Sequence, residues 1–487
     1  MDKPPPFPRF DRKTLETFSK DELIDLVLAM QDHIARLEAR IDGLERRLAQ
    51  NSANSSRPPS TDPPGNPALP KPRRKSRRSR GAQPGHPPQW RALLPESDVT
   101  RLVDHRPDHC QACGLPLTPA DDPQPVRHQF IDLPPIRPEV TEHRCHAMVC
   151  SCGAVTRAPL PLGLPDSPFG PGLAAMVATL TGVCHLSRRN ALDFVNNALN
   201  VPMSLGGLSN CEAQMTRALE WPAEEVHEYV QRQGVAHADE TSFGVGPRQK
   251  GWLWVMAVPL AMVFALARTR ATAAARKLIG AFRGVLVTDR YGAYNAVAER
   301  RQVCWAHLGR DFQALSERKG LAGRIGLRLV KERRRMFRLW HRVRDGTLSR
   351  EKFARRVEGI GRNIHGCLFE GALHAEAGAR GTFAELLKAE KWFWTFVSVP
   401  GVEPTNNEAE RCIRGAVLWR KGSFGALSER GGLYVERMLT VTGTCRKQGR
   451  QVYGYLRDAM AAYQSGRKAP SLLPTFAHIP STCHKTA

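Results

Sequence analysis

Apolar residues recur every seven positions near the N-terminus. Two interleaved series run through residues 19–50: Leu23, Met30, Leu37 and Leu44, and Val27, Ile34, Ile41 and Leu48. This a/d pattern extends over about three to four heptads, and it predicts a long helix that self-associates as a coiled coil. The alternative is an amphipathic helix docked on its own chain. We disfavour that alternative because the segment that follows cannot supply a core.

The apolar periodicity stops over residues 51–100. This segment is rich in Ser, Asn and Pro, and such a composition cannot bury enough apolar surface to fold, so we expect a disordered linker. A basic tract within it contains Arg73, Arg74, Lys75, Arg77 and Arg78. A flexible basic arm can neutralise DNA phosphates and release their counterions, so we predict DNA contacts for these residues.

Two cysteine pairs lie in the Pro-rich segment 101–165. Cys110-x-x-Cys113 and Cys150-x-Cys152 are each followed by Gly, which suits two tight turns that present thiolates to one tetrahedral Zn²⁺. The second pair is one residue shorter than usual, so Cys145 or His146 could replace one of its members. The sequence predicts a small domain with a structural zinc at Cys110, Cys113, Cys150 and Cys152.

Helical periodicity returns over residues 166–233. Two helical segments flank the turn VPMSLGGLS, and a further apolar helix precedes them. Helix, short Gly-containing turn and helix are consistent with a helix-turn-helix that binds DNA, although an ordinary helical hairpin fits equally well.

From residue 234 the pattern changes to that of a mixed α/β core, residues 234–308. Residues 235–243 alternate as a strand does, two further strands follow, and then come a helix, the apolar run VLVTD, a short helix and the segment QVCWAHL as a fifth strand. This order is that of a ribonuclease H-like fold, in which the first and fourth strands are neighbours. Asp239 on the first strand and Asp289 at the end of the fourth would then lie side by side. Glu240 should point away from Asp239, as a surface ion pair.

Residues 309–400 predict a basic helical insertion, and residues 401–465 the last part of the core, followed by a tail over 466–487. Phosphodiester cleavage by two Mg²⁺ (or Mn²⁺) ions requires hard oxygen ligands, so a third carboxylate should join Asp239 and Asp289. Glu408 and Glu410 are the candidates. We choose Glu410 because residues three, four and seven positions later form a partly apolar, sheet-facing stripe.

Several residues near this glutamate suit a nucleic-acid partner. Arg411, Arg414, Arg420 and Lys421 follow it and are predicted to hold DNA phosphates. We expect burial of Trp392 and Trp394 rather than stacking on a flipped base. Cys304 and His307 have metal-ligand spacing, and we interpret them as packing residues or as partners in a catalytic-site hydrogen bond, with zinc as the less favoured alternative.

The charge of the chain agrees with a polyanionic partner. Lys and Arg number 71 against 47 Asp and Glu, which gives a formal net charge of +24. We find neither a long uninterrupted apolar stretch nor a secretory signal, so we expect a cytoplasmic, nucleoid-associated protein with no membrane partner and reduced cysteines.

The segments HADET, VTDRYGAY, CWAHLGRDF and TNNEAERCIRGAVLWRKGSFGALSERGG resemble those of transposases of the insertion-sequence 66 family. The resemblance extends over nearly the whole chain. It implies a DDE active site on Asp239, Asp289 and Glu410, transposition at terminal inverted repeats of double-stranded DNA, and small accessory proteins of the same element. The competing hypotheses are a catalytically inactive DNA-binding regulator from a decayed element and a ribonuclease H-like nuclease.

Overall fold

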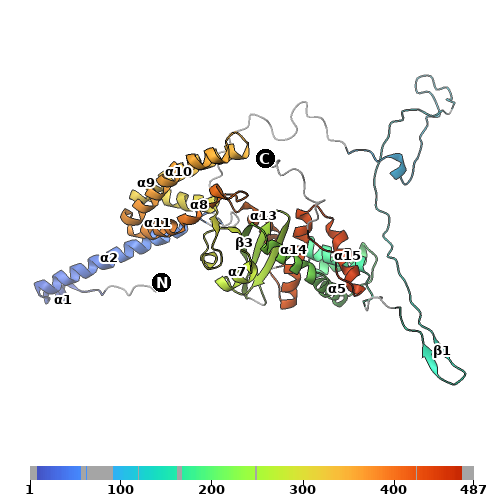
Figure 1. Ribbon diagram of the computed structural model, residues 1–487, viewed down its shortest axis with the longest axis horizontal. Helices are drawn as coiled ribbons and strands as arrows, with labels where there is room; N and C mark the ends of the chain where they lie inside the picture. The colour runs from blue at the N-terminus through green and yellow to red at the C-terminus, as the bar shows by residue number, and fades with distance from the viewer. Residues whose placement is uncertain are drawn as a thin grey trace.

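The computed structural model describes residues 8–55, 62, 91–118, 120–161, 167–246, 249–423 and 425–473. The predicted basic arm, Arg73 to Arg78, lies outside these described residues, as do most of the predicted linker and the end of the tail. A mixed sheet occupies the centre of the molecule, with helices packed around it (Figure 1). Within the described part of the chain, no helix is both long and apolar enough to span a membrane.

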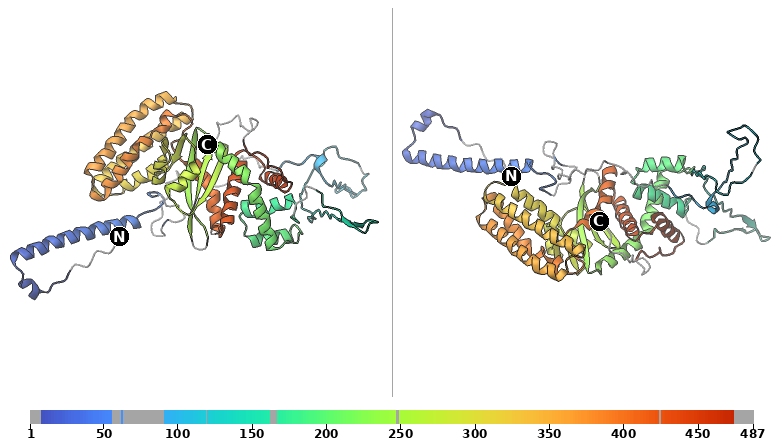
Figure 2. Two further views of the ribbon diagram at one scale, coloured as in Figure 1. Left: turned by 60° about the horizontal axis from the view of Figure 1, so that its bottom comes forward. Right: turned by 90° about the horizontal axis from the view of Figure 1, so that it is seen from above.

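The N-terminal segment contains the predicted long helix. A short helix α1 (Arg12–Glu16) precedes α2 (Lys20–Leu48). Ser19 begins α2 with a capping box, since its side chain accepts from the Glu22 amide and the Glu22 carboxylate accepts from the Ser19 amide. Figures 1 and 2 show α2 projecting away from the sheet, beside the helical lobe. Just beyond its end, Asn54 Nδ2 donates to Glu317 Oε2 over 2.7 Å.

The central sheet has five strands in the order β5-β4-β3-β6-β7. Its strands are β3 (Val235–Gly244), β4 (Lys250–Val258), β5 (Ala261–Ala267), β6 (Val285–Thr288) and β7 (Arg301–Val303). β3 pairs antiparallel with β4 and parallel with β6, and β6 pairs parallel with β7. The first and fourth strands of the core are therefore neighbours, as predicted.

The predicted fifth strand is only partly correct. β7 ends at Val303, and helix α8 (Trp305–Ser316) begins two residues later, inside the segment that we expected to be strand. Trp305, Leu308 and Phe312 are fully buried at helical spacing. A short apolar run cannot by itself distinguish a strand from the start of a buried helix, and packing against the insertion decides for the helix here.

One edge of the sheet is covered by a helix. The amides of Met262, Phe264 and Leu266 in β5 point away from β4 and donate to side chains of α14 (Glu429–Lys447), namely Thr444, Thr440 and Glu436. These three acceptors are spaced four residues apart on one face of α14. The helix thereby satisfies the unpaired edge and prevents strand addition there.

Helices surround the sheet in two groups, each with its own apolar core. The first group packs on β3, β4 and β5, and consists of α3 (Pro171–Ala178), η3 (Thr179–Val183), α4 (Arg188–Asn197), α5 (Leu205–Ala218), α6 (Glu220–Gln231), α7 (Thr272–Ile279), η4 (Gly292–Ala296), α13 (Asn407–Ser423), α14 and α15 (Val452–Gln464). The second consists of α8, α9 (Gly320–Arg344), α10 (Arg350–His374), α11 (Ala377–Ala389), η5 (Glu390–Trp392) and α12 (Thr395–Ser398), and forms the helical lobe of Figure 2. A helical segment over 309–400 was predicted.

The predicted zinc segment has little regular structure. It contains a two-stranded hairpin of β1 (Ala147–Val149) and β2 (Val155–Arg157), and η2 (Glu96–Asp98) lies just before it, in the segment predicted as a disordered linker. Most of its side chains are exposed. This segment therefore adds nothing to the two apolar cores.

Candidate active site

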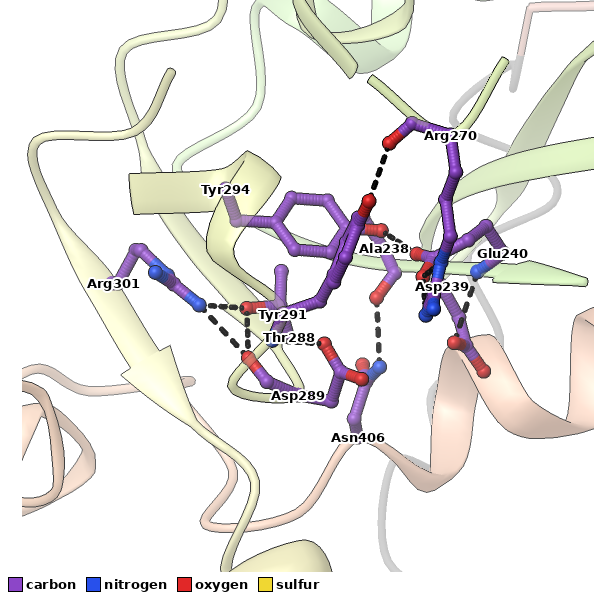
Figure 3. Close-up of polar contacts among 10 residues, drawn as sticks. All are labelled: Ala238, Asp239, Glu240, Arg270, Thr288, Asp289, Tyr291, Tyr294, Arg301 and Asn406. Carbon is purple, nitrogen blue, oxygen red and sulfur yellow. Dashed lines mark hydrogen bonds and ion pairs between the residues drawn. The ribbon is translucent and has the colours of Figure 1, made fainter. Parts of the chain in front are cut away.

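Asp239 and Asp289 lie beside each other at the centre of the sheet. The parallel register of β3 and β6 pairs His237 with Val287, and each aspartate comes two residues after its member of that pair. Asp289 directly follows the end of β6, so it lies just beyond the sheet, next to β3. The charge of Asp289 acts on Asp239, whose pKa it helps to raise. Figure 3 shows both aspartates in the same small region.

Burial is the main influence on the pKa of Asp239. Removal from water raises the pKa of Asp239 well above its ordinary value, and the charges of Glu240, Asp289 and Glu410 raise it further. The Glu240 amide, which donates to Asp239 Oδ1 over 2.9 Å, opposes this shift only in part. Three neighbouring carboxylates thus act together on the pKa of Asp239.

Glu410 lies in the first turn of α13, which packs on β3. Its side chain is 35% exposed, and its Oε1 atom is buried without a hydrogen-bond partner. Glu408 is different, because its carboxylate pairs with Lys447 of α14 and with Arg411. Burial alone would raise the pKa of Glu408, but these two cations lower it below its ordinary value. Of the two glutamates, Glu408 is thus neutralised by partners within the fold.

Glu240 lies on the opposite face of β3, and its predicted role as a surface ion pair was wrong. Its side chain is 1% exposed and pairs with Arg270, whose Nε donates to Oε1 over 2.9 Å. The hydroxyl of Tyr294 donates to the other oxygen over 2.5 Å (Figure 3). The alternation of the strand correctly predicted the direction, but burial on that face depends on η4, which packs over it.

Asn406 connects the sheet to α13, and sequence reasoning missed it. Its Nδ2 donates to the Ala238 carbonyl over 2.8 Å, and its Oδ1 accepts from His237 Nδ1 over 3.2 Å. Its backbone amide donates to Cys304 Sγ over 3.1 Å. A fully buried asparagine directly before α13 therefore ties together β3, α8 and the helix that carries Glu410. The paired asparagines in the sequence were the only signal for it.

Arg301 holds the end of β6, and it too was missed. Its Nη2 donates to Thr288 Oγ1 and to the Asp289 carbonyl, each over 2.8 Å (Figure 3). The guanidinium also lies over the ring of Trp392, 4.8 Å from the ring centre. Burial lowers the pKa of Arg301 to about 10, which still leaves it charged at neutral pH. The arginine thus fixes the backbone that presents Asp289.

Cys304 and His307 lie next to Glu410, at the start of α8. His307 Nδ1 is 3.8 Å from Glu410 Oε1. Burial raises the pKa of the Cys304 thiol to about 11 and lowers the pKa of His307. Both groups are therefore uncharged at neutral pH when no ion is bound.

The four basic residues of α13 that we predicted to bind DNA differ in their surroundings. Arg411 pairs with Glu408, and Arg420 donates to Ser242 and Thr241 on β3. Arg414 and Lys421 are exposed. Trp392 and Trp394, for which we expected burial, are partly buried and pack against the apolar core of the helical lobe.

The structure does not bring the two cysteine pairs together. Cys110 and Cys113 occupy one turn, while Cys150 and Cys152 occupy the turn of the β1–β2 hairpin. Among the described residues, the group of three or more side chains close enough to share a metal ion is Cys304, His307 and Glu410. A zinc site on the four cysteines remains a prediction.

The site thus combines a mixed five-stranded sheet, carboxylates whose charges act on Asp239, and a helix that carries basic residues. A family model described as Transposase IS66 family matches residues 166–433, which is more than half of the chain. The chain therefore belongs to the IS66 family of transposases. A second model, described as a family of unknown function (DUF6444), matches residues 12–92.

Curated relatives come from Sinorhizobium fredii (strain NBRC 101917 / NGR234). The uncharacterized protein y4hP is 25% identical over 406 residues, which cover 74% of this chain and 71% of the relative. The uncharacterized protein y4qI is 24% identical over 287 residues, which cover 52% of each chain. The chain thus spans about half the length of the second relative, and neither name assigns an activity.

Proposed function

We propose that this IS66-family protein is a DDE-type transposase that binds the terminal inverted repeats of its element and cleaves and joins DNA strands. Asp239, Asp289 and Glu410 would hold divalent Mg²⁺ or Mn²⁺ ions. The observation that carries the proposal is the convergence of three carboxylates from β3, the end of β6 and α13, where their charges act together on the pKa of Asp239. The strand order of a ribonuclease H-like core supports the same assignment.

The residues at this site suit a divalent cation. Buried carboxylates repel one another unless a cation neutralises them, and Glu410 Oε1 has no protein partner. Carboxylate oxygens are the ligands that Mg²⁺ prefers. When bound, such ions would activate the attacking oxygen and stabilise the leaving oxygen of a phosphodiester.

Other residues near the carboxylates position this site. Asn406 holds the start of α13 against β3, and Arg301 holds the backbone of Asp289. Arg414 and Lys421 are exposed on the helix that carries Glu410, and they would bind phosphates of the substrate.

The heptad residues of α2 are exposed along that helix, which supports association of copies as a homodimer or higher oligomer.

Two alternative functions differ from this proposal in the chemistry that the protein would perform. A regulator that only binds DNA would not need Asp239, Asp289 or Glu410, and a ribonuclease H-like nuclease would use the same carboxylates on another substrate. The exposed heptad seam and the basic residues favour a DNA transposase over a nuclease that acts as a monomer. Strand transfer of end DNA separates all three.

The test is cleavage of a linear duplex that carries the terminal repeats flanking the gene, with Mg²⁺ or Mn²⁺ present. We expect Glu410→Gln and Asp239→Asn to abolish cleavage while binding of the duplex in a mobility-shift assay is retained. Glu408→Gln is the matched control, because Glu408 is paired with Lys447 and Arg411. Its rate should fall less than about tenfold, equivalent to under about 1.4 kcal/mol of barrier.

Wild-type cleavage by Glu410→Gln or Asp239→Asn would refute the assignment of the carboxylates. Equal loss in both glutamate variants would show that the choice of Glu410 over Glu408 is wrong. Binding without cleavage by the wild-type protein under all metal conditions would favour the regulator.

A further inference from the structure

A sulfur, a nitrogen and an oxygen ligand meet beside the carboxylate cluster. Cys304, His307 and Glu410 each offer one ligand atom, and these atoms all lie within 4.8 Å of one another. Cys304 immediately precedes α8, His307 lies in its first turn, and Glu410 comes from α13, more than a hundred residues later. The fold therefore assembles this group from two separate segments.

The contacts between these residues are unsatisfied without an ion. His307 Nδ1 and Glu410 Oε1 are 3.8 Å apart, which is too long for a hydrogen bond. Both atoms are buried and have no hydrogen-bond partner. The catalytic-site hydrogen bond that we expected of His307 is thus not made with Glu410. Two ligands of one tetrahedral zinc lie about 3.3–3.6 Å apart, given Zn–N, Zn–O and Zn–S bonds of about 2.0–2.3 Å.

The chemistry of the three ligands selects the kind of ion. Thiolate and imidazole favour Zn²⁺ and related transition metals, whereas Mg²⁺ prefers oxygen ligands alone. The amide of Asn406 donates to Cys304 Sγ over 3.1 Å, as outer-shell donors do for metal-bound thiolates. Three protein ligands leave a fourth position for water, and the partly exposed Glu410 lies on the open side.

We propose that Cys304, His307 and Glu410 bind one borderline transition-metal ion of the Zn²⁺ class, at a position distinct from the all-carboxylate site. Glu410 belongs to both groups of ligands. An ion held by Cys304 and His307 would withdraw Glu410 from Asp239 and Asp289, and would inhibit Mg²⁺-dependent cleavage. The inhibition rests on the proposed function, whereas the binding does not.

Binding is tested with Co²⁺, which reports thiolate ligation by a near-ultraviolet charge-transfer band. The full-length chain is used with Cys110, Cys113, Cys150 and Cys152 replaced by serine, so that the four thiolates of the predicted structural zinc are absent. We expect the band to saturate at one equivalent of Co²⁺. Cys304→Ser should remove the band, and His307→Gln and Glu410→Gln should each weaken Co²⁺ binding at least tenfold. A thermal melt of each variant checks its fold.

Cys445→Ser is the matched control, since Cys445 is also fully buried but lies in α14. It should keep the band. If the four-serine background fails to fold, zinc stoichiometry of the otherwise native chain replaces it, and Cys304→Ser should bind one equivalent fewer. No band in the folded background, or equal loss in Cys445→Ser, would overturn the proposal, as would unchanged zinc content in Cys304→Ser.

Cleavage supplies a separate measurement. Micromolar Zn²⁺ added to a Mg²⁺ reaction should inhibit the native chain, and the inhibition of Cys304→Ser, relative to its own rate in Mg²⁺ alone, should be at least tenfold weaker. A Co²⁺ band in a chain that cleaves no DNA would leave the metal site standing and reject the proposed function. Active protein with no band would reject the metal site alone.

Discussion

Neighbouring acidic residues of β3 have different partners. Burial and the charge of Asp289 raise the pKa of Glu240, and hydrogen bonds from the Tyr294 hydroxyl and from Arg270 oppose that shift. Asp239 faces α13 and has only a backbone amide as a donor. The difference arises from the alternation of side chains along a strand, because each face packs against different elements. Asp239 is therefore the acidic residue of this strand to which the proposed function assigns a divalent cation.

This imbalance predicts that Asp239→Asn stabilises the metal-free protein. Removing a buried charge that has no cation partner should raise the free energy of unfolding by about 0.5–2 kcal/mol and Tm by a few degrees. Thermal melts in EDTA at neutral pH measure the effect. Asp458→Asn is the control, since Asp458 is exposed on α15 and pairs with Arg457.

The stability that Asp239→Asn gains should depend on pH. The pKa of folded Asp239 is raised, so ionisation costs stability as the pH rises from its ordinary value of about 3.9 through the folded pKa. Below the ordinary value both states are protonated, and the advantage of the asparagine should vanish. Added Mg²⁺ should stabilise the wild type and not Asp239→Asn. A wild type more stable than the variant in EDTA would contradict this account.

Helix α13 is fixed to β3 near both of its ends. At its start, Asn406 donates to Ala238. Near its end, Arg420 Nη1 donates to the Ser242 carbonyl and hydroxyl, each over 2.6 Å, and to Thr241 Oγ1 over 3.1 Å. Glu410 is carried between these two anchors. The helix holds its carboxylate over Asp239 because it is attached to the strand that bears that aspartate.

Two arginines of this helix should therefore respond differently to alanine substitution. Arg420→Ala removes hydrogen bonds to β3 and should lower the free energy of unfolding by about 1–3 kcal/mol. Arg414→Ala removes an exposed side chain, so its stability should stay within about 0.5 kcal/mol of wild type. If Arg414 binds a phosphate, its variant should reduce the salt dependence of DNA binding by about one ion.

Thermal melts and binding isotherms over a range of salt concentrations measure both effects. Destabilisation by Arg414→Ala as large as by Arg420→Ala would show that the hydrogen bonds of Arg420 do not anchor α13. A salt dependence unchanged in Arg414→Ala would remove it from the DNA interface.

At the scale of the whole molecule, α2 presents an apolar seam that the rest of the described chain leaves uncovered. Val27, Ile34 and Ile41 are each at least half exposed. A long exposed row of aliphatic side chains is unfavourable in water, and a second copy of the helix would bury it. This exposure supports self-association over docking on the same chain, which were the two alternatives for the heptad pattern.

The double substitution Ile34→Asp and Ile41→Asp should convert the oligomer to a monomer in sedimentation velocity. Charged residues at a positions of a coiled coil cannot be buried without a partner. Asp32→Asn, on the outer side of the same helix, should leave the mass unchanged. An oligomer that survives the double substitution would place the contact elsewhere.

Zinc content tests the segment between α2 and the core. The full chain, dialysed against a weak chelator, should retain one equivalent of zinc on Cys110, Cys113, Cys150 and Cys152. The double variant Cys110→Ser and Cys150→Ser should lose it, because a tetrahedral site needs four ligands. A zinc content in this variant equal to that of the full chain would mean that the two pairs do not share an ion.

The sequence by itself predicted most of the elements and the neighbouring positions of Asp239 and Asp289. Helices and strands follow from the spacing of apolar residues, which is a local property, and Asp289 closes a short apolar run of the kind typical of a buried strand. The order of these elements was enough to place the first strand beside the fourth. The same local pattern was ambiguous at Cys304–His307, where a helix begins instead of a strand continuing.

Tertiary structure alone decided the partner of each polar side chain. Asn406 reaches Ala238 across 168 positions of the chain, and Arg420 reaches Ser242 across 178. Which glutamate of α13 is neutralised depends on Lys447, which comes from another helix. The physical reason is that apolar periodicity is repeated along the chain, whereas a hydrogen bond or ion pair joins two particular atoms that only the packing of distant segments brings together.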